Sequence, residues 1–446
     1  MEKIVIRLAI VMLLLLLGSD RPARATDLIE VYRMAVAADP AFIAAGYTHQ
    51  ASQETRIQAN SGYLPALVGS YDWSGTRQEI IESDNALFQR GAAEYSTHSA
   101  LLSLVQPLFR YASYVRIQQS KVEVMQADAE FEEARQNLLM RSAENYLNAL
   151  AAEDQLDFIR AERSAVERQL LLAKAKEKAL LGRRSDLLEA QARLASVAAD
   201  FSEAEVNRRD AYEAIYELTG EVPTSLKKLQ NEFPLVAPDP PDVVGYWVAA
   251  ALQQNWEIQV QRHAVEVQRQ EVSRQNAGHF PTVDLELRES YKNSGGTMFG
   301  GGSEVQNTEV FVNFKLPLYL GGSINSKKRQ ALFEYKAEKS ELVRISRKVR
   351  RETEKGYSAI VNAIQRVKAR EMEVDAQSEV LKLKRAGYQA SLYTNLSVLD
   401  AERDLYSGKR HLARARYEYL LNSLKLRSIV GVLAEEDLVS LNQWLN

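Results

Sequence analysis

The sequence predicts a mainly α-helical protein with a transmembrane β-barrel portion, built by internal duplication. Segments of the first half recur about 210 to 216 residues later, a spacing too long for a solenoid repeat. Four segments alternate between apolar and polar residues, as strands do, and two very long segments contain no proline. Each half is therefore expected to hold a helix, two strands and a long helical hairpin.

Three matched pairs of segments carry the internal repeat. They are Gly62–Leu67 with Gly278–Val283, Val105–Phe109 with Lys315–Tyr319, and Leu188–Gln191 with Leu399–Glu402. Because the matches keep their order, we expect a first structural repeat over 26–220 and a second over 246–431. A proline-rich equatorial linker over 221–245 joins them, and 432–446 forms a C-terminal equatorial tail.

The first 25 residues have the pattern of a secretory signal peptide. Lys3 and Arg7 give a basic start, an apolar run follows from Leu8 to Leu17, and Ala23–Ala25 is a small-residue cleavage site. The apolar run is too short to stay in a bilayer as a helix. We therefore expect residues 1–25 to be removed on export, and a retained N-terminal anchor is the less favoured alternative.

Composition excludes several classes of function. The absence of cysteine excludes disulfides, zinc–thiolate sites, thiol catalysis and a lipid anchor on an N-terminal cysteine. A formal net charge of −3 with interspersed signs gives no basis for binding nucleic acid. The five histidines lack spaced metal-ligating partners, and no serine lies in a nucleophile elbow. We therefore expect no catalytic residue, no metal and no cofactor, so the protein is not predicted to be an enzyme.

The four alternating segments are predicted to be strands. In the clearest, Thr282 to Tyr291, alternate residues are apolar and the residues between them are charged. The others are Asn307 to Leu316, Leu67 to Ser74 and Ser99 to Leu104. The pattern is fainter in the two segments of the first half, but we expect each strand to be about 10 residues long, which is enough for a tilted strand to cross a membrane. Two soluble hairpins packed on helices remain an alternative. In a membrane, several copies must share one barrel, because lipid does not tolerate an open sheet edge.

The two long segments without proline are predicted to be helical rods. They run from Ser113 to Leu181 and from Ile324 to Ala386, and each is on the order of 100 Å long. Each rod turns back, near Gly182 or Gly387, and continues as a second helix over 186–218 or 396–426. A solvated coiled coil is the usual outcome for such charged helices in a lone chain. If copies assemble, the helices can continue the barrel wall as a tube.

The ordered set of elements resembles the TolC family of outer-membrane efflux and secretion channels. The best local matches are Tyr388–Ala401 and Ala413–Leu426, and the resemblance covers essentially the whole mature chain. It implies a homotrimer in the outer membrane, in which each chain gives four strands to one barrel and a long α-helical barrel extends into the periplasm. The missing N-terminal cysteine resembles the non-lipidated branch.

The resemblance also implies a function. The protein would be the passive, gated exit duct of a tripartite efflux pump or a type I secretion system, surrounded by outer-membrane lipid. Its partners would be a periplasmic adaptor and an inner-membrane transporter of the ABC, RND or MFS type, which supplies the energy. Two alternatives are a soluble periplasmic coiled-coil scaffold or adaptor, and an outer-membrane enzyme, which would need a polar site that the sequence does not offer.

In the family, polar contacts at the helical tips hold the periplasmic entrance shut. Carried over to this sequence, Tyr388 would face Asp186. The neighbouring family arginine aligns with Tyr393, opposite Ser185, so a charged lock at that level is missing. Ordinary polarity of a helix surface is the alternative for these residues.

Two further groups of residues follow from the same resemblance. Of two aspartates that ring the entrance constriction in the family, one aligns with Asp400 and the other with Ser397. We therefore expect a thinner acidic filter with a weaker preference for cations. Arg183 and Arg184, near the first tip, are candidate contacts with the adaptor.

Overall fold

The computed structural model describes residues 25–82, 91–230, 232–238, 243–296, 301–390 and 392–445. Residues 1–24 of the predicted signal peptide therefore lie outside the described residues. The chain forms two compact units. One comprises the chain up to Gly46 with Phe131–Trp256 and Ser346–Asn446, and the other comprises Tyr47–Glu130 and Glu257–Ile345.

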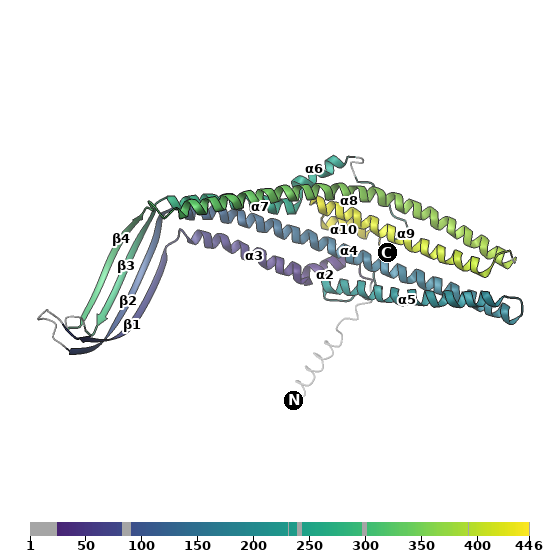
Figure 1. The fold of residues 1–446 in the computed structure, drawn as a ribbon, viewed down its shortest axis with the longest axis horizontal. Helices are drawn as coiled ribbons and strands as arrows, with labels where there is room; N and C mark the ends of the chain where they lie inside the picture. Colours follow the sequence, from purple (N-terminus) through teal and green to yellow (C-terminus); the bar gives the residue numbers. More distant parts are fainter. Residues whose placement is uncertain are drawn as a thin grey trace, which may run out of the picture. The chain divides into compact units, whose positions relative to one another are not determined.

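The order of elements repeats in the two halves of the chain (Figure 1). The first half contains α2 (Leu28–Ala38), α3 (Pro40–Ser61), β1 (Ala66–Ile80), β2 (Gly91–Arg110), α4 (Tyr111–Lys178) and α5 (Arg184–Thr219). The second contains α6 (Val244–Gln254), α7 (Trp256–Asn276), η1 (Ala277–His279), β3 (Thr282–Ser294), β4 (Ser303–Lys315), α8 (Ser323–Gln389), α9 (Asn395–Val430) and α10 (Glu435–Asn442). Corresponding helices have almost equal lengths, 68 and 67 residues for α4 and α8 and 36 for both α5 and α9. The predicted duplication is confirmed.

The four strands form one antiparallel sheet in the order β1-β2-β3-β4 (Figure 1). Their lengths of 15, 20, 13 and 13 residues exceed the expected lengths, because the hydrogen-bonded pairing continues beyond the alternating segments. A register shift between Pro107 and Phe109 marks a bulge in β2, which is a usual place for a residue that lacks a backbone N–H. Within the described chain, β1 and β4 are the edge strands.

The two faces of the sheet differ in polarity. Leu104 lies opposite both Leu67 and Leu287, and Leu287 lies opposite Val310, so these side chains share one apolar face. The same register places the predicted apolar residues together: Leu67, Tyr71, Trp73, Ala100, Leu102, Leu104, Val283, Leu285, Leu287, Val310, Val312 and Phe314. On the other face Glu286 accepts hydrogen bonds from Ser103 at 3.1 Å and Asn313 at 3.2 Å.

The long helices are built from good helix formers and end at identifiable signals. Gly220 and Gly431 follow α5 and α9 with φ of 71° and 90°, the left-handed conformation that closes a helix C-terminus. Gly182 lies in the link between α4 and α5, as expected. Gly387 instead lies inside α8, which continues to Gln389. Among the residues described, no helix is both long and apolar enough to cross a membrane.

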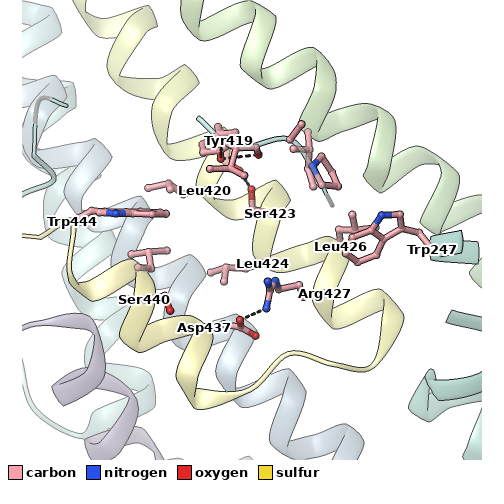
Figure 2. A pocket seen from close by; sticks show the side chains of 15 residues that line it. Trp247, Tyr419, Leu420, Ser423, Leu424, Leu426, Arg427, Asp437, Ser440 and Trp444 are labelled. Carbon is pink, nitrogen blue, oxygen red and sulfur yellow. Dashed lines mark hydrogen bonds and ion pairs between the residues drawn. The ribbon is translucent and has the colours of Figure 1, made fainter. Parts of the chain in front are cut away.

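The linker and the tail pack together on the helical unit. Backbone bridges join Thr26 to Leu226 and Leu229 to Leu445. The Tyr419 hydroxyl accepts a hydrogen bond from Val236 N at 2.8 Å and donates one to Val236 O at 3.1 Å. Figure 2 shows the hollow beside this contact, which has a volume of about 290 Å³ and is lined by Trp247, Leu424 and Trp444 among others.

Candidate functional site

The tip of the first hairpin combines a strained backbone with exposed apolar side chains. α4 ends at Lys178, and Leu180 follows with φ of 62°, a conformation that a leucine rarely adopts. The backbone N–H groups of Leu181 and Gly182 both donate to the Lys176 carbonyl, at 2.8 and 3.0 Å. This tight turn leaves Leu180 93% and Leu181 83% exposed. The tip therefore presents two apolar side chains to solvent on a strained turn.

The tip of the second hairpin is closed by a capped helix start. Thr394 is the N-cap of α9, and its hydroxyl accepts a hydrogen bond from Ser397 N at 3.2 Å. The Ser397 hydroxyl lies 3.0 Å from the same oxygen, so this predicted constriction residue is engaged in the cap. The ring of Tyr393 lies directly against Gly387 of the same hairpin, so close that a Cβ at Gly387 would overlap it. That contact explains why α8 has a glycine so close to its end.

Tyr388 reaches the first hairpin through its ring. The Lys176 ammonium lies 4.0 Å from the ring centroid of Tyr388, within the range of a cation–π contact. The Tyr388 hydroxyl is buried and has no hydrogen-bond partner among the residues that the structure describes. A single subunit therefore does not form the Tyr388–Asp186 hydrogen bond, and that pairing stays a prediction for the assembled protein.

Asp186 is instead bound through its backbone by a residue that the sequence reasoning missed. Asn395 is completely buried, and its Nδ2 donates to the Asp186 carbonyl at 3.1 Å. Its Oδ1 accepts a hydrogen bond from the buried Gln169 of α4. Asn395 thus connects α9 with both helices of the first hairpin. An asparagine beside a threonine cap is common at helix starts, so its type alone did not mark it.

Asp400, the retained aspartate of the predicted constriction, has a cationic neighbour on its own helix. Arg403 Nη1 lies 3.2 Å from Asp400, and the same guanidinium lies 2.9 Å from Asp404. These carboxylates raise the pKa of Arg403, the hydrogen bond with Asp404 being the largest cause. The negative charge of Asp400 is therefore partly balanced by Arg403. The i, i+3 spacing of the two residues on one helix already predicts this pairing.

Arg183, Arg184 and Ser185 start the second helix of the first hairpin. All three are exposed, and Arg183 is the N-cap of α5 without a side-chain cap bond. Neither arginine forms an ion pair within the described ranges. Over the same ranges, no cluster of His, Cys, Asp and Glu could hold a metal ion.

Two tandem repeats, each with two strands and one long helical hairpin, together form a four-stranded sheet with one apolar face, and this is the architecture of outer-membrane channel proteins. The chain belongs to the family described as outer membrane efflux protein, which matches residues 31–221 and 247–432.

Named relatives extend over nearly the whole chain. The chain is 29% identical to the proteases secretion protein PrtF of Dickeya chrysanthemi, covering 98% of this chain and 95% of the relative. It is 31% identical to the outer membrane protein TolC of Vibrio cholerae, covering 94% of each. The crystal structure of the Campylobacter jejuni CmeC outer membrane channel has the same fold, with a TM-score of 0.77 and 15% identity over 94% of this chain and 90% of that one.

These comparisons confirm the predicted fold class, the outer-membrane localisation and the role as an outer-membrane component of efflux and secretion systems. They do not favour the soluble periplasmic scaffold, and the role of the family is transport.

Proposed function

We propose that three copies of this chain share one barrel and form a passive, gated exit duct. The observation that carries the proposal is the sheet, which has one apolar face and, among the described residues, an unpaired outer edge on both β1 and β4. In lipid each backbone N–H and C=O must be hydrogen-bonded, so β1 of one copy has to pair with β4 of the next. The polar face, with Glu286 and Arg288, then lines the lumen.

The hairpin tips support the partner proposal. Exposed Leu180 and Leu181 lie beside the exposed Arg183 and Arg184, a combination of apolar and basic groups suited to a protein partner. We assign this surface to a periplasmic adaptor. An inner-membrane transporter of the ABC, RND or MFS type supplies the energy, and the duct itself performs no chemistry.

We assign the closed entrance to residues at the tips of both helical hairpins. Tyr388 has a buried hydroxyl with no hydrogen-bond partner in the described part of the chain, and Asp186 lies at the start of α5, so a neighbouring subunit can complete this pair. Ser185 and Tyr393 flank it at the tips. Asp400, weakened by Arg403, forms the acidic filter with Ser397 at the aligned second position.

Single-channel recording in planar bilayers tests the duct and its filter together. The wild type should conduct with a modest preference for cations. Asp400→Ala should abolish that preference, while Arg403→Gln should increase it severalfold, because the carboxylate of Asp400 then loses its counter-charge. Arg414→Gln, which removes an exposed arginine of α9 paired with Glu418, is the matched control and should behave like wild type. Purified protein that forms no channel, or a channel that prefers anions, would refute the proposal.

A further inference from the structure

Two apolar clusters lie along the helical hairpins. In one core the buried residues are Leu156, Ile159, Val166, Ala190, Val197 and Ala204 of α4 and α5, joined by Leu399 of α9. The other core contains Leu381, Val398, Ala401 and Leu405 of α8 and α9. In these two clusters Leu399 is thus the one buried apolar side chain that crosses from α9 to the first hairpin. We call this contact between α9 and the α4/α5 hairpin the seam.

Polar contacts between α4 and α9 lie along the seam. Gln169 of α4 bonds Asn395 of α9, as described above. Further along, the Tyr417 hydroxyl of α9 donates to Asp154 of α4 at 2.7 Å. Between these two, Arg410 of α9 binds Glu162 of α4 at 2.8 Å. The α4 partners are spaced by about two helical turns, so they lie on one face, and their α9 partners follow in the reverse order.

Glu162 is a buried carboxylate among these contacts. Its side chain is only 2% exposed, and its two oxygens bind two guanidinium groups from different helices. Oε1 accepts from Arg193 of α5, within the first hairpin, and Oε2 accepts from Arg410 of α9, across the seam. A buried carboxylate with one partner removed is strongly unfavourable, but here Arg193 stays when Arg410 leaves. The seam can therefore part without leaving Glu162 unpaired.

We propose that Glu162 and Arg410 are positioning residues of the gate, holding α9 against the first hairpin and so keeping the entrance shut. The proposal rests on the gated duct proposed above, because α9 carries Asp400 and Ser397 at the constriction. The ion pair joins α9 to a buried carboxylate of the first hairpin, so its loss should weaken the docking of α9. The guanidinium of Arg410, with a quarter of its side chain exposed, regains water as α9 moves away.

Three variants, each replacing one charged side chain with glutamine, separate this role from a general loss of stability. Arg410→Gln removes the bond across the seam, and Glu162→Gln leaves two arginines facing each other without a counter-charge. Arg193→Gln removes one charge from the same cluster but keeps the Glu162–Arg410 bond. In bilayer recordings, we expect the open fraction to rise roughly tenfold for Arg410→Gln and further for Glu162→Gln, and to stay near wild type for Arg193→Gln.

A double variant gives a readout that damaged folding would not produce. In the double variant Glu162→Gln/Arg410→Gln, Arg193 no longer faces a second arginine, so the repulsion is gone. The open fraction of the double variant should therefore be lower than that of Glu162→Gln alone. All variants must first yield as much heat-modifiable trimer as wild type. If wild type conducts, Asp400→Ala changes its selectivity, and both seam variants stay as closed as wild type, the seam proposal is wrong while the duct stands. Equal opening in Arg193→Gln and Arg410→Gln would also overturn it.

Discussion

At the scale of single residues, the helical unit keeps phenols as permanent hydrogen-bond donors between its long helices. Burial raises the pKa of Tyr417 and of Tyr212 well above the ordinary value of a phenol, and their carboxylate partners Asp154 and Glu153 add to the shift. Both hydroxyls therefore stay protonated at any pH that the protein meets. A contact between a neutral phenol and a carboxylate can then respond to pH only through the acid.

Asp154 is that acid, and its titration predicts a pH dependence of stability. Burial raises the pKa of Asp154, although the Tyr417 hydrogen bond opposes the shift. Between the ordinary pKa and the raised one, the folded state binds more protons than the unfolded chain, so the free energy of unfolding falls as pH rises through this window. Asp154→Asn removes this loss. The difference in thermal stability between Asp154→Asn and wild type should therefore favour the variant more at about pH 7 than at about pH 4.

Thermal unfolding of the helical circular dichroism signal in detergent, at the two pH values, measures this difference. Tyr417→Phe is the control, since it removes the hydrogen bond that opposes the shift but keeps the carboxylate, so its pH dependence should be at least as large as that of wild type. If the gap between wild type and Asp154→Asn is the same at both pH values, Asp154 does not titrate in this window.

Few residues of the candidate site could be recognised without the structure. Asp186, Tyr388 and Asp400 were found through a resemblance, not through their chemistry, because each lies among other polar residues on a charged helix. Glu162 and Asn395 were missed for the same reason. Among many Glu–Arg spacings in these helices, nothing in the sequence tells which glutamate lies between two helices, and only packing identifies the buried one.

At the scale of elements, the sequence predicted the helices and strands well because their periodicity is long and regular. Strand ends were placed too early, since the pairing continues where the apolar alternation stops. Gly387 is expected near the turn between α8 and α9 because glycine often ends a helix. In the structure it does not end α8 but makes room for the ring of Tyr393. Such a close approach is a tertiary contact that local sequence does not reveal.

Gly220 and Gly431 occupy equivalent helix ends in the two halves but meet different surroundings. Both are left-handed, so alanine at either position should cost about 1–2 kcal/mol in the free energy of unfolding. At Gly220 a new Cβ meets no atom within 4 Å, whereas at Gly431 it would overlap the backbone carbonyl of Gln254. Gly431→Ala should therefore cost clearly more than Gly220→Ala. Denaturant unfolding of the two variants measures both costs, and equal costs would mean that α6 moves away freely.

At the scale of the whole molecule, the sheet is the part that a single chain cannot complete. Its apolar face is fully open in one copy, with Val310, Val312 and Phe314 of β4 each more than 60% exposed. An isolated edge strand of this kind would aggregate in water. The proposed assembly in a membrane would resolve both problems, because lipid would cover the face and a neighbouring copy would cover the edge.

Adjacent residues of β4 provide the sharpest comparison for this assembly. Val312 lies on the apolar face opposite Leu285, and Asn313 lies on the polar face, within reach of Glu286. Arginine on the lipid side of a barrel costs about 2–4 kcal/mol near the bilayer midplane, while a lumen position has water and a carboxylate. Val312→Arg should therefore reduce the yield of heat-modifiable trimer in outer-membrane fractions severalfold, and Asn313→Arg should leave it unchanged. Equal yields would place both faces in water, and the reverse order would mean that the polar face meets lipid.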